Sequence, residues 1–557
     1  MPHHTRSAIF ARVILLPIGL VLVTVVGLGS YYEASDDTSI AWLFSGVLAL
    51  KPVTSLPLYF RGFGRVLAAA YTAWPGVAWF GLLLSALLAA ATVMLLAVLD
   101  RVLRPYLRPW PLALVIAGFF GVALLENWLL FSYVRVALLL AGASVLFASQ
   151  RPGRLAPLLV GLGGLGAVWL MRPSLAVLGF GATLPAALLL AGGLRRAAPL
   201  LLSAAFVLAV ATGTAAFLRT PTETHTQVLD GYFARILDFD QLRPQPRTPA
   251  DSLGTAAVAL WMMGDSTVVN EALCRRAYVF DAPDFWGREV PAKLWLRAGL
   301  LVRDYFPLLL ALVATAGVWL RRRGRSAWFW VVQLGFAGVF VLFAGVLKLP
   351  PRLELPLLVF WLLTNLAFLL VNNPTEIIRH NGARWNPLLV AVATVVLLLH
   401  GAKTLHRRQV LGQERARHEL ALQTINRLGA GRIRIMAGTN DLLKSLSPFQ
   451  TYAPGPGAVL QLTGWPSHDA SQGRLRQALS GTSDQTECLR RFAQRPSSGP
   501  QPQPLWVLTP ETATWLSRRF SFNGGSRLLL YPSAGCLLEG PDSTVRVYHV
   551  RAVPTLW

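Results

Sequence analysis

Acidic residues and cysteine are scarce in this sequence, which holds 27 Asp and Glu and 3 Cys among 557 residues. Charged residues of both signs make up only 14% of the chain, whereas hydrophobic residues make up 54%. A soluble protein of this length has too little interior to hide so much apolar sequence. The composition therefore argues against a soluble protein and indicates a protein that spans a membrane.

The three cysteines, Cys274, Cys488 and Cys536, lack the spacing of a metal site. Cys488 and Cys536 could form a disulfide bond if their part of the chain lies in an oxidising compartment, and free thiols are the alternative. His225 and His468 have no second ligand at metal-site spacing. The cysteines and histidines therefore give no argument for a metal ion.

Basic residues outnumber acidic ones, and the formal net charge is +24. The arginines interrupt apolar runs instead of forming one basic face, so membrane topology explains most of them. Membrane lipid is therefore an expected partner, and nucleic acid is not.

About eleven apolar runs are interpreted as membrane-spanning helices, because each span in lipid must satisfy its own backbone hydrogen bonds. They lie at 13–29, 75–99, 110–131, 134–149, 156–171, 174–193, 198–217, 300–320, 326–347, 355–371 and 387–401. No cleavage site of the Ala-x-Ala kind follows the first run, so we expect an uncleaved span. Residues 1–401 are thus predicted to form an all-α polytopic membrane module.

Short arginine-rich connections, such as those around Arg151 and Arg195, alternate with the other connections between runs. Cytoplasmic loops carry such an excess of Lys and Arg. We therefore expect the N-terminus inside, and the loops 30–74 and 218–299 and the tail 402–557 outside.

The tail 402–557 differs from the rest of the chain. It opens with a charged stretch at 407–427, which is predicted to be helical. Alternating apolar segments at 432–436, 505–508 and 528–531 predict strands, and segments at 440–446, 474–480 and 510–519 predict helices. A small extracytoplasmic α/β domain without a catalytic motif is expected here.

Three carboxylates, Glu33, Asp36 and Asp37, lie where the first span reaches the outer surface. A carboxylate there can take a proton from an attacking hydroxyl or hold a divalent ion. Mutual repulsion can raise the pKa of one of the two adjacent aspartates toward the range of a general base. The alternative is that Glu33, Ser35 and Asp36 cap the helix that follows.

Asp36-Asp37 is the first of three motifs that come in order along the chain. The others are Lys51-Pro52 and Pro75-Gly76 with Trp79. In this order the chain resembles the GT-C class of integral-membrane glycosyltransferases, and more closely a bacterial group within it that has Asp-Asp, Gly-Lys-Pro and Pro-Gly-x-x-Trp-Tyr.

The chain departs from that group at three places. Leu50 precedes Lys51 where the group has Gly, and Phe80 follows Trp79 where it has Tyr. Gly264-Asp265-Ser266 stands where a Ser-x-Asp-x segment is usual, which leaves the role of Asp265 open. The resemblance covers residues 1 to about 375 and excludes the tail.

The resemblance implies an inverting transfer of a sugar from a polyprenyl-phosphate carrier to a glycan, lipid or protein acceptor. The reaction would occur at the outer face of the bacterial cytoplasmic membrane, with Asp36 or Asp37 as the base. Asp37 is slightly favoured, because Asp36 can equally orient the acceptor or cap the helix. A divalent metal is a possible cofactor.

A departing lipid phosphate needs cationic groups where negative charge develops. Arg172 lies at the outer end of one span, and Lys348 and Arg352 lie at the outer end of another. Arginine suits phosphate because its planar fork donates two hydrogen bonds at once. The alternative is that these side chains reach toward lipid headgroups, which is the favoured interpretation for Arg61 and Arg65.

Two other functions remain open on sequence alone. A transporter or flippase of a lipid-linked or anionic solute would need broken helices and charges inside spans, and the charges here lie mainly at span ends. A non-catalytic protein of envelope assembly is the third alternative. Asp238, Asp240, Asp281 and Asp284 are expected to be solvated, and Glu126, at a span end, receives no role.

Overall fold

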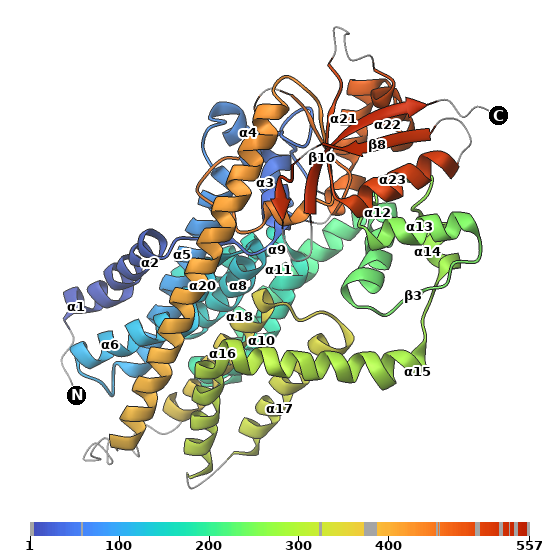
Figure 1. Ribbon diagram of the computed structural model, residues 1–557. Coiled ribbons are helices and arrows are strands. Elements are labelled where there is room, and N and C mark those ends of the chain that lie inside the picture. Colours follow the sequence, from blue (N-terminus) through green and yellow to red (C-terminus); the bar gives the residue numbers. More distant parts are fainter. Residues whose placement is uncertain are drawn as a thin grey trace.

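The structure is a computed structural model. It describes residues 5–56, 59–321, 326–371, 387–452, 455, 457–495, 502–522, 527–533, 535–539 and 544–553. A bundle of long apolar helices occupies one end of the molecule, and a sheet flanked by short helices occupies the other (Figure 1).

Within the described residues, eight helical segments are long and apolar enough to cross a membrane. Two shorter apolar helices, α8 (Tyr133–Ser149) and α9 (Leu155–Met171), lie among them. The chain is therefore a mostly helical, multi-pass membrane protein. The eight segments are α1–α2 (Arg6–Gly27), α5 (Trp79–Leu103), α6–α7 (Pro109–Leu129), α10 (Pro173–Ala191), α11 (Leu194–Phe217), α15–α16 (Ala282–Leu320), α17 with its π-helical extension (Ala327–Val346) and α18 (Pro351–Val371).

Helix α8 lies at the centre of the bundle, and every residue in it except Phe147 is buried. Helices α5, α9, α10 and α18 pack around it. Gly142 of α8 leaves no room for a Cβ, because the ring of Phe360 in α18 occupies that position. Small residues at such contacts let helices approach closely in a membrane.

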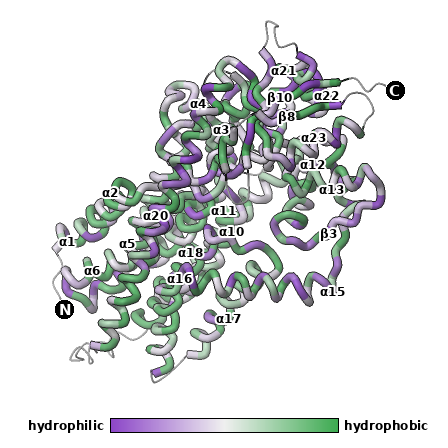
Figure 2. Tube along the Cα trace, viewed as in Figure 1, coloured by the Kyte–Doolittle hydropathy of each residue, from purple (hydrophilic) through white to green (hydrophobic). Residues whose placement is uncertain are grey.

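The outer helices present large apolar side chains, including Val26, Phe206 and Leu334, to the surroundings. Apolar colouring accordingly runs along the whole length of the bundle (Figure 2). Such a surface suits contact with lipid tails better than contact with water.

Two long connections between spans carry helices that lie beside the C-terminal part of the chain (Figure 1). Helix α3 (Ser35–Ser45) and helix α4 (Phe63–Ala73) belong to the first long connection. The second contributes α12 (Pro221–Phe233), α13 (Pro249–Ala259) and α14 (Glu271–Ala277), and its strands β3 (Arg243–Pro244) and β4 (Tyr278–Val279) pair antiparallel. A short parallel pair, β1 (Tyr31–Tyr32) with β2 (Leu130–Phe131), aligns the chain just before α3 with the chain just before α8.

Helix α20 (Pro387–Leu428) is one continuous helix of 42 residues. The sequence predicted a span at 387–401 and a separate charged helix at 407–427, and the structure joins them. The helix runs along the bundle to the sheet (Figure 1, orange). Its apolar first part and its charged second part therefore share one rigid axis.

The residues after α20 form a six-stranded mixed sheet in the order β6-β5-β7-β10-β8, with β9 paired to β10. Strands β5, β6 and β7 are parallel, whereas β10 runs antiparallel to β7, β8 and β9. The strands are β5 (Arg434–Ala437), β6 (Val459–Gln461), β7 (Leu505–Leu508), β8 (Arg527–Pro532), β9 (Leu538–Glu539) and β10 (Thr544–Val553). The helices are α21 (Ala470–Ser480), α22 (Gln485–Ala493) and α23 (Pro510–Phe522).

Most of the short tail segments predicted from sequence coincide with these elements. The predicted helix at 440–446 is instead a single 3-10 turn at Asn440–Leu443. Strand β10 and helix α22 have no counterpart in the prediction. Cys274, Cys488 and Cys536 are free thiols, and Cys488 is buried within α22.

Candidate functional site

A cavity of about 400 Å³ lies where ends of the apolar helices meet the two long connections and the C-terminal part of the chain. Asp36, Arg172, Lys348 and Arg352 all line it. These residues come from distant parts of the sequence, and the fold brings them to one cavity. Asp37 does not line this cavity.

Asp36 lies in the first turn of α3 with its side chain 35% exposed. One carboxylate oxygen lies 3.7 Å from a guanidinium nitrogen of Arg352. The helix begins after Ala34, which makes no side-chain capping bond. Side-chain capping therefore does not explain why a carboxylate stands here, although its position in the first turn suits the helix dipole.

Asp37 is fully buried, and its Oδ1 accepts a hydrogen bond of 2.8 Å from the backbone N–H of Tyr133. Its other oxygen has no partner among the described residues. Burial raises the pKa of Asp37 to about 8, against the opposing effects of the Tyr133 hydrogen bond and the charge of Arg352. The charges of Asp36 and Glu33 contribute less than burial does, so repulsion between adjacent carboxylates is a secondary cause.

Arg172 lies between α9 and α10, where its Nη1 donates a hydrogen bond of 2.9 Å to the hydroxyl of Tyr133. Its guanidinium also lies over the ring of Tyr59, 5.1 Å from the ring centre. Among the described residues, no carboxylate lies within 4.0 Å of this guanidinium. Arg172 is therefore a cation that faces the cavity with aromatic rather than acidic neighbours.

Lys348 lies just before α18, and its ammonium group pairs with Asp238 of the second long connection. Arg352 lies in the first turn of α18. Asp238, which was expected to be a solvated acid, has a side chain that is 36% exposed and lines the cavity beside this lysine. Arg172, Lys348 and Arg352 are together called the cationic wall of the cavity. Lys348 and Arg352 each have a carboxylate nearby, whereas Arg172 has none within 4.0 Å among the described residues.

Two cavity residues could not be recognised from spacing in the sequence. Nε2 of His468 lies 3.0 Å from Oδ1 of Asp230, and both residues line the cavity. They come from the C-terminal part of the chain and from α12. Aromatic side chains of Phe233, Trp261 and Trp465 line the same region. The C-terminal part, in which no catalytic motif was found, therefore helps to build the site.

Asp265, whose role was open, does not line the cavity. It is buried and accepts hydrogen bonds from Arg519 at 3.0 Å and from Thr486 at 2.6 Å. Both partners belong to the C-terminal part. The contacts indicate that Asp265 fastens the second long connection to that part of the chain.

Other acidic residues of the second long connection also have basic partners. Asp240 pairs with Lys293 at 3.0 Å, and Asp284 pairs with Arg288 at 3.1 Å. Asp281 accepts a hydrogen bond from the backbone N–H of Asp284 at 3.1 Å. None of these three aspartates lines the cavity.

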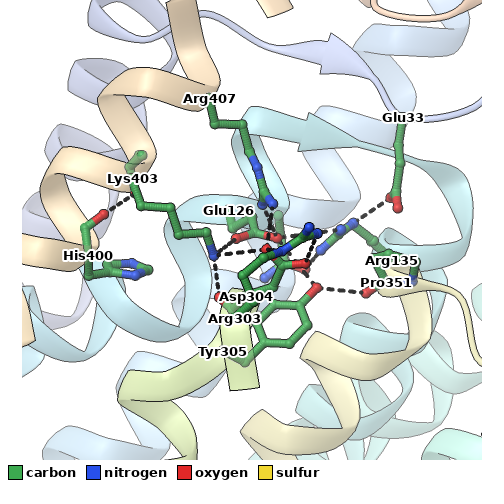
Figure 3. A network of polar contacts seen from close by, with 12 residues as sticks. Glu33, Glu126, Arg135, Arg303, Asp304, Tyr305, Pro351, His400, Lys403 and Arg407 are labelled. Atoms are coloured by element: carbon green, nitrogen blue, oxygen red, sulfur yellow. Dashed lines mark hydrogen bonds and ion pairs between the residues drawn. The ribbon is translucent and has the colours of Figure 1, made fainter. Parts of the chain in front are cut away.

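A buried cluster of charged side chains supports the site from within the bundle (Figure 3). Nε of Arg135 lies 2.6 Å from Oε2 of Glu33, three residues before Asp36. The hydroxyl of Tyr305 reaches the carbonyl oxygen of Pro351, next to Arg352, at 3.4 Å. The cluster therefore holds both segments that meet at the Asp36–Arg352 pair.

Glu126 is the centre of this cluster, which explains a carboxylate at the end of a span. Arg407 of α20 lies 2.9 Å from Glu126 and 3.1 Å from Asp304. Lys403 lies 3.8 Å from Glu126 and 3.7 Å from Asp304, and Figure 3 shows both cations reaching from α20 toward the two carboxylates. Buried charges cost free energy unless they are paired in this way.

A protein-built metal site does not fit the described residues. They contain no group of three or more His, Cys, Asp or Glu side chains placed to hold an ion. Asp36 faces the cavity, whereas Asp37 is turned to the backbone of Tyr133. The two adjacent carboxylates therefore do not form a joint ligand pair.

Comparisons of the chain with protein-family models, with curated proteins and with solved structures find no match.

Proposed function

We propose that this protein transfers a sugar from a polyprenyl-phosphate carrier to an acceptor hydroxyl at the outer face of a membrane. The supporting observation is that Asp36 and the cations Arg172, Lys348 and Arg352 line one cavity. Such a transfer needs a base and a cationic phosphate site side by side. The resemblance to GT-C glycosyltransferases points to the same chemistry.

Asp36 is the base in this mechanism. The acceptor oxygen attacks the anomeric carbon while its proton passes to Asp36. The bond between the anomeric carbon and the phosphate oxygen breaks, and that oxygen keeps the electron pair. Attack from the face opposite the phosphate inverts the anomeric configuration. Asp37 is less suitable, because it lies outside the cavity and its pKa of about 8 keeps it protonated at neutral pH.

The phosphate that leaves is received by the cationic wall. Arg172 has no carboxylate partner among the described residues, so its charge is available to a ligand. Arg352 lies 3.7 Å from Asp36 and also lines the cavity, so it can contact the departing phosphate beside the base. Lys348 can exchange its contact with Asp238 for a contact with phosphate.

This function requires a definite placement in the membrane. We propose about eleven spans, with the N-terminus inside and the C-terminal part outside as an extracytoplasmic α/β domain. The membrane is the bacterial cytoplasmic membrane, and the acceptor is a glycan, lipid or protein. In support, residues from both long connections and from the C-terminal part line the same cavity.

Transport or flipping of a lipid-linked or anionic solute is the second candidate function. The cluster of Glu126, Asp304, Lys403 and Arg407 favours it, because buried charges within a bundle often mark a solute pathway. Against it, each of these side chains already has an opposite charge nearby, as a structural cluster would.

Reconstitution in lipid nanodiscs separates the candidates. The full chain is incubated with a panel of undecaprenyl-phosphate hexoses and pentoses and an acceptor extract, and release of undecaprenyl phosphate is measured. We expect release by the wild type, and a loss of roughly 10²- to 10⁴-fold in Asp36→Asn, because a general base contributes about that factor.

The matched control is Asp240→Asn, a nearby carboxylate that pairs with Lys293 and does not line the cavity. It should keep the wild-type rate. Full activity in Asp36→Asn would remove Asp36 as the base. Movement of the sugar lipid across liposome membranes, without release of undecaprenyl phosphate, would favour transport.

A further inference from the structure

The cavity has a second wall that the proposed reaction leaves without a role. This wall consists of Asp230 and Phe233 of α12, Trp261, and Trp465 and His468 of the C-terminal part. It carries two ionisable side chains among aromatic rings, whereas the first wall carries the three cations. The two walls therefore differ in the chemistry that they offer to a ligand.

Asp230 and His468 each keep one unused polar atom. Oδ1 of Asp230 and Nε2 of His468 contact each other at 3.0 Å. Oδ2 of Asp230 and Nδ1 of His468 are buried and have no hydrogen-bond partner among the described residues. A buried polar atom without a partner costs free energy, so the pair keeps unused hydrogen-bonding capacity. The two side chains are 21% and 13% exposed, and both line the cavity, where a ligand can contact them.

Aromatic rings surround this pair. The ring of His468 lies 5.6 Å from that of Phe233, with an interplanar angle of 63°. The ring of Trp465 lies 6.0 Å from that of Tyr59, in an edge-to-face arrangement. Aromatic faces combined with a few polar groups suit a ligand that is apolar on one side and rich in hydroxyl groups on the other.

Backbone contacts fix this wall in place. The N–H of Gly464 donates a hydrogen bond of 2.8 Å to the carbonyl oxygen of Trp261. Trp261 has a φ of 58°, a left-handed conformation that is unusual for a bulky residue. A Cβ at Gly264 would meet the carbonyl oxygen of Ser467 at 2.7 Å. The turn that carries His468 is thus seated closely on the second long connection, and such strained positions often occur at binding sites.

We propose that Asp230, His468 and Trp465 form a subsite for a neutral sugar ring. The inference rests on the proposed function and names the part of the cavity that recognises the sugar. The exposed part of the Asp230 carboxylate accepts a hydrogen bond from one hydroxyl group, and the exposed part of the His468 imidazole contacts a second. The apolar face of the ring packs on Trp465.

Charge excludes a second phosphate from this subsite. The contacts of Arg172, Lys348 and Arg352 go to Tyr133, Asp238 and Asp36, and within the described residues none of the three cations pairs with Asp230. An anion beside Asp230 would be repelled. A hydroxyl group, in contrast, donates to a carboxylate in a charge-assisted bond that is stronger than a neutral one. The position of the subsite fits a sugar of either the donor lipid or the acceptor, and both sources share this chemistry.

The test measures two kinds of binding to the full chain in nanodiscs. Affinities for undecaprenyl phosphate and for the panel of undecaprenyl-phosphate sugars are compared in wild type, Asp230→Asn, His468→Gln and Trp465→Ala. Binding of free methyl glycosides is followed separately by saturation-transfer NMR. Asp240→Asn is the control, and affinity for undecaprenyl phosphate shows whether each variant is folded.

We expect the wild type to bind at least one sugar lipid more tightly than undecaprenyl phosphate. Asp230→Asn should lose roughly 10- to 100-fold of that preference, the effect of a hydrogen bond with a charged group. His468→Gln and Trp465→Ala should also reduce the preference, because they remove the imidazole contact and the aromatic surface. Affinity for undecaprenyl phosphate itself should not change. Competition between methyl glycosides and the sugar lipid would assign the subsite to the donor, and simultaneous binding would assign it to the acceptor.

Two results would overturn the inference, and a third affects only the proposed function. A wild-type preference that survives in all three variants removes the subsite and leaves the phosphate site intact. The subsite is also rejected if the wild type binds undecaprenyl phosphate but shows no preference for any sugar lipid and binds no glycoside. Asp230-dependent binding of glycosides without binding of any polyprenyl lipid would keep the subsite and reject the transfer reaction.

Discussion

The carboxylate of Asp36 lies 3.7 Å from the guanidinium of Arg352, although the two residues belong to the first long connection and to the start of α18. The contact is longer than a direct hydrogen bond. It therefore holds the carboxylate near a cation without occupying its oxygens. An acceptor hydroxyl can approach Asp36 from the cavity while Arg352 remains within reach of a phosphate.

Replacing Arg352 with Gln should slow sugar transfer by roughly 10²- to 10³-fold, as loss of one group that stabilises developing negative charge does in other enzymes. Arg352→Lys should recover only part of the loss, because lysine cannot donate in a planar fork. Release of undecaprenyl phosphate measures the effect. Arg65→Gln is the control, since Arg65 is exposed and lies outside the cavity. Equal activity in Arg352→Gln and Arg65→Gln would contradict the role.

Replacing Tyr133 with Phe should weaken binding of undecaprenyl phosphate by less than about tenfold, the effect of one neutral hydrogen bond. The change removes the hydroxyl that accepts from Arg172 but keeps the backbone N–H that donates to Asp37. Arg172→Met should weaken binding more, because it also removes the charge. Nanodisc binding assays compare the two variants. A larger loss in Tyr133→Phe than in Arg172→Met would mean that Arg172 is not the phosphate ligand.

The sequence could indicate one wall of the cavity but not the other. Arg172, Lys348 and Arg352 stand out because a charge at the end of an apolar run is a local signal. Asp230 and His468 carry no such signal, since the contact between them depends on how the C-terminal part packs on the second long connection. Adjacent residues on a helix also face different directions. Which of Asp36 and Asp37 reaches the cavity is therefore decided by how α3 packs against α4, α5 and the turn at Asn440–Leu443, which turns Asp37 toward the backbone of Tyr133.

The long helix α20 shows a similar limit for the fold. Its apolar part and its charged part have different composition, so each predicts a separate element. The continuous backbone places Lys403 and Arg407 beside Glu126 and Asp304. Local composition could not show that these charges balance one another across three helices, α7, α16 and α20.

The pKa of Asp37 predicts a pH dependence of stability. The folded chain keeps a proton on Asp37 up to about pH 8, whereas the unfolded chain releases it near the ordinary value of 3.8. The folded state binds more protons between these values, so this contribution to stability falls as pH rises from about 4 to about 8 and is lost above that.

Asp37→Asn should remove this dependence of stability on pH, because an amide does not titrate. Its oxygen can still accept the hydrogen bond from the backbone N–H of Tyr133. Melting temperatures of the detergent-solubilised chain at pH 5 and pH 8 measure the difference. We expect the gap between the two pH values to shrink in Asp37→Asn relative to the wild type and to Asp240→Asn. A gap that stays the same would show that Asp37 is charged in the folded protein.

Replacing Glu126 with Gln should destabilise the bundle by about 3–5 kcal/mol, the usual cost of leaving a buried charge without its partner. Glu126 is 7% exposed and lies near Arg135, Lys403 and Arg407. Glu271→Gln is the matched control, because Glu271 pairs with an arginine that is 68% exposed. Such surface pairs contribute about 0–1 kcal/mol. Thermal unfolding of both variants in the same detergent compares the two losses, and equal losses would show that the cluster around Glu126 does not hold α20 to the bundle.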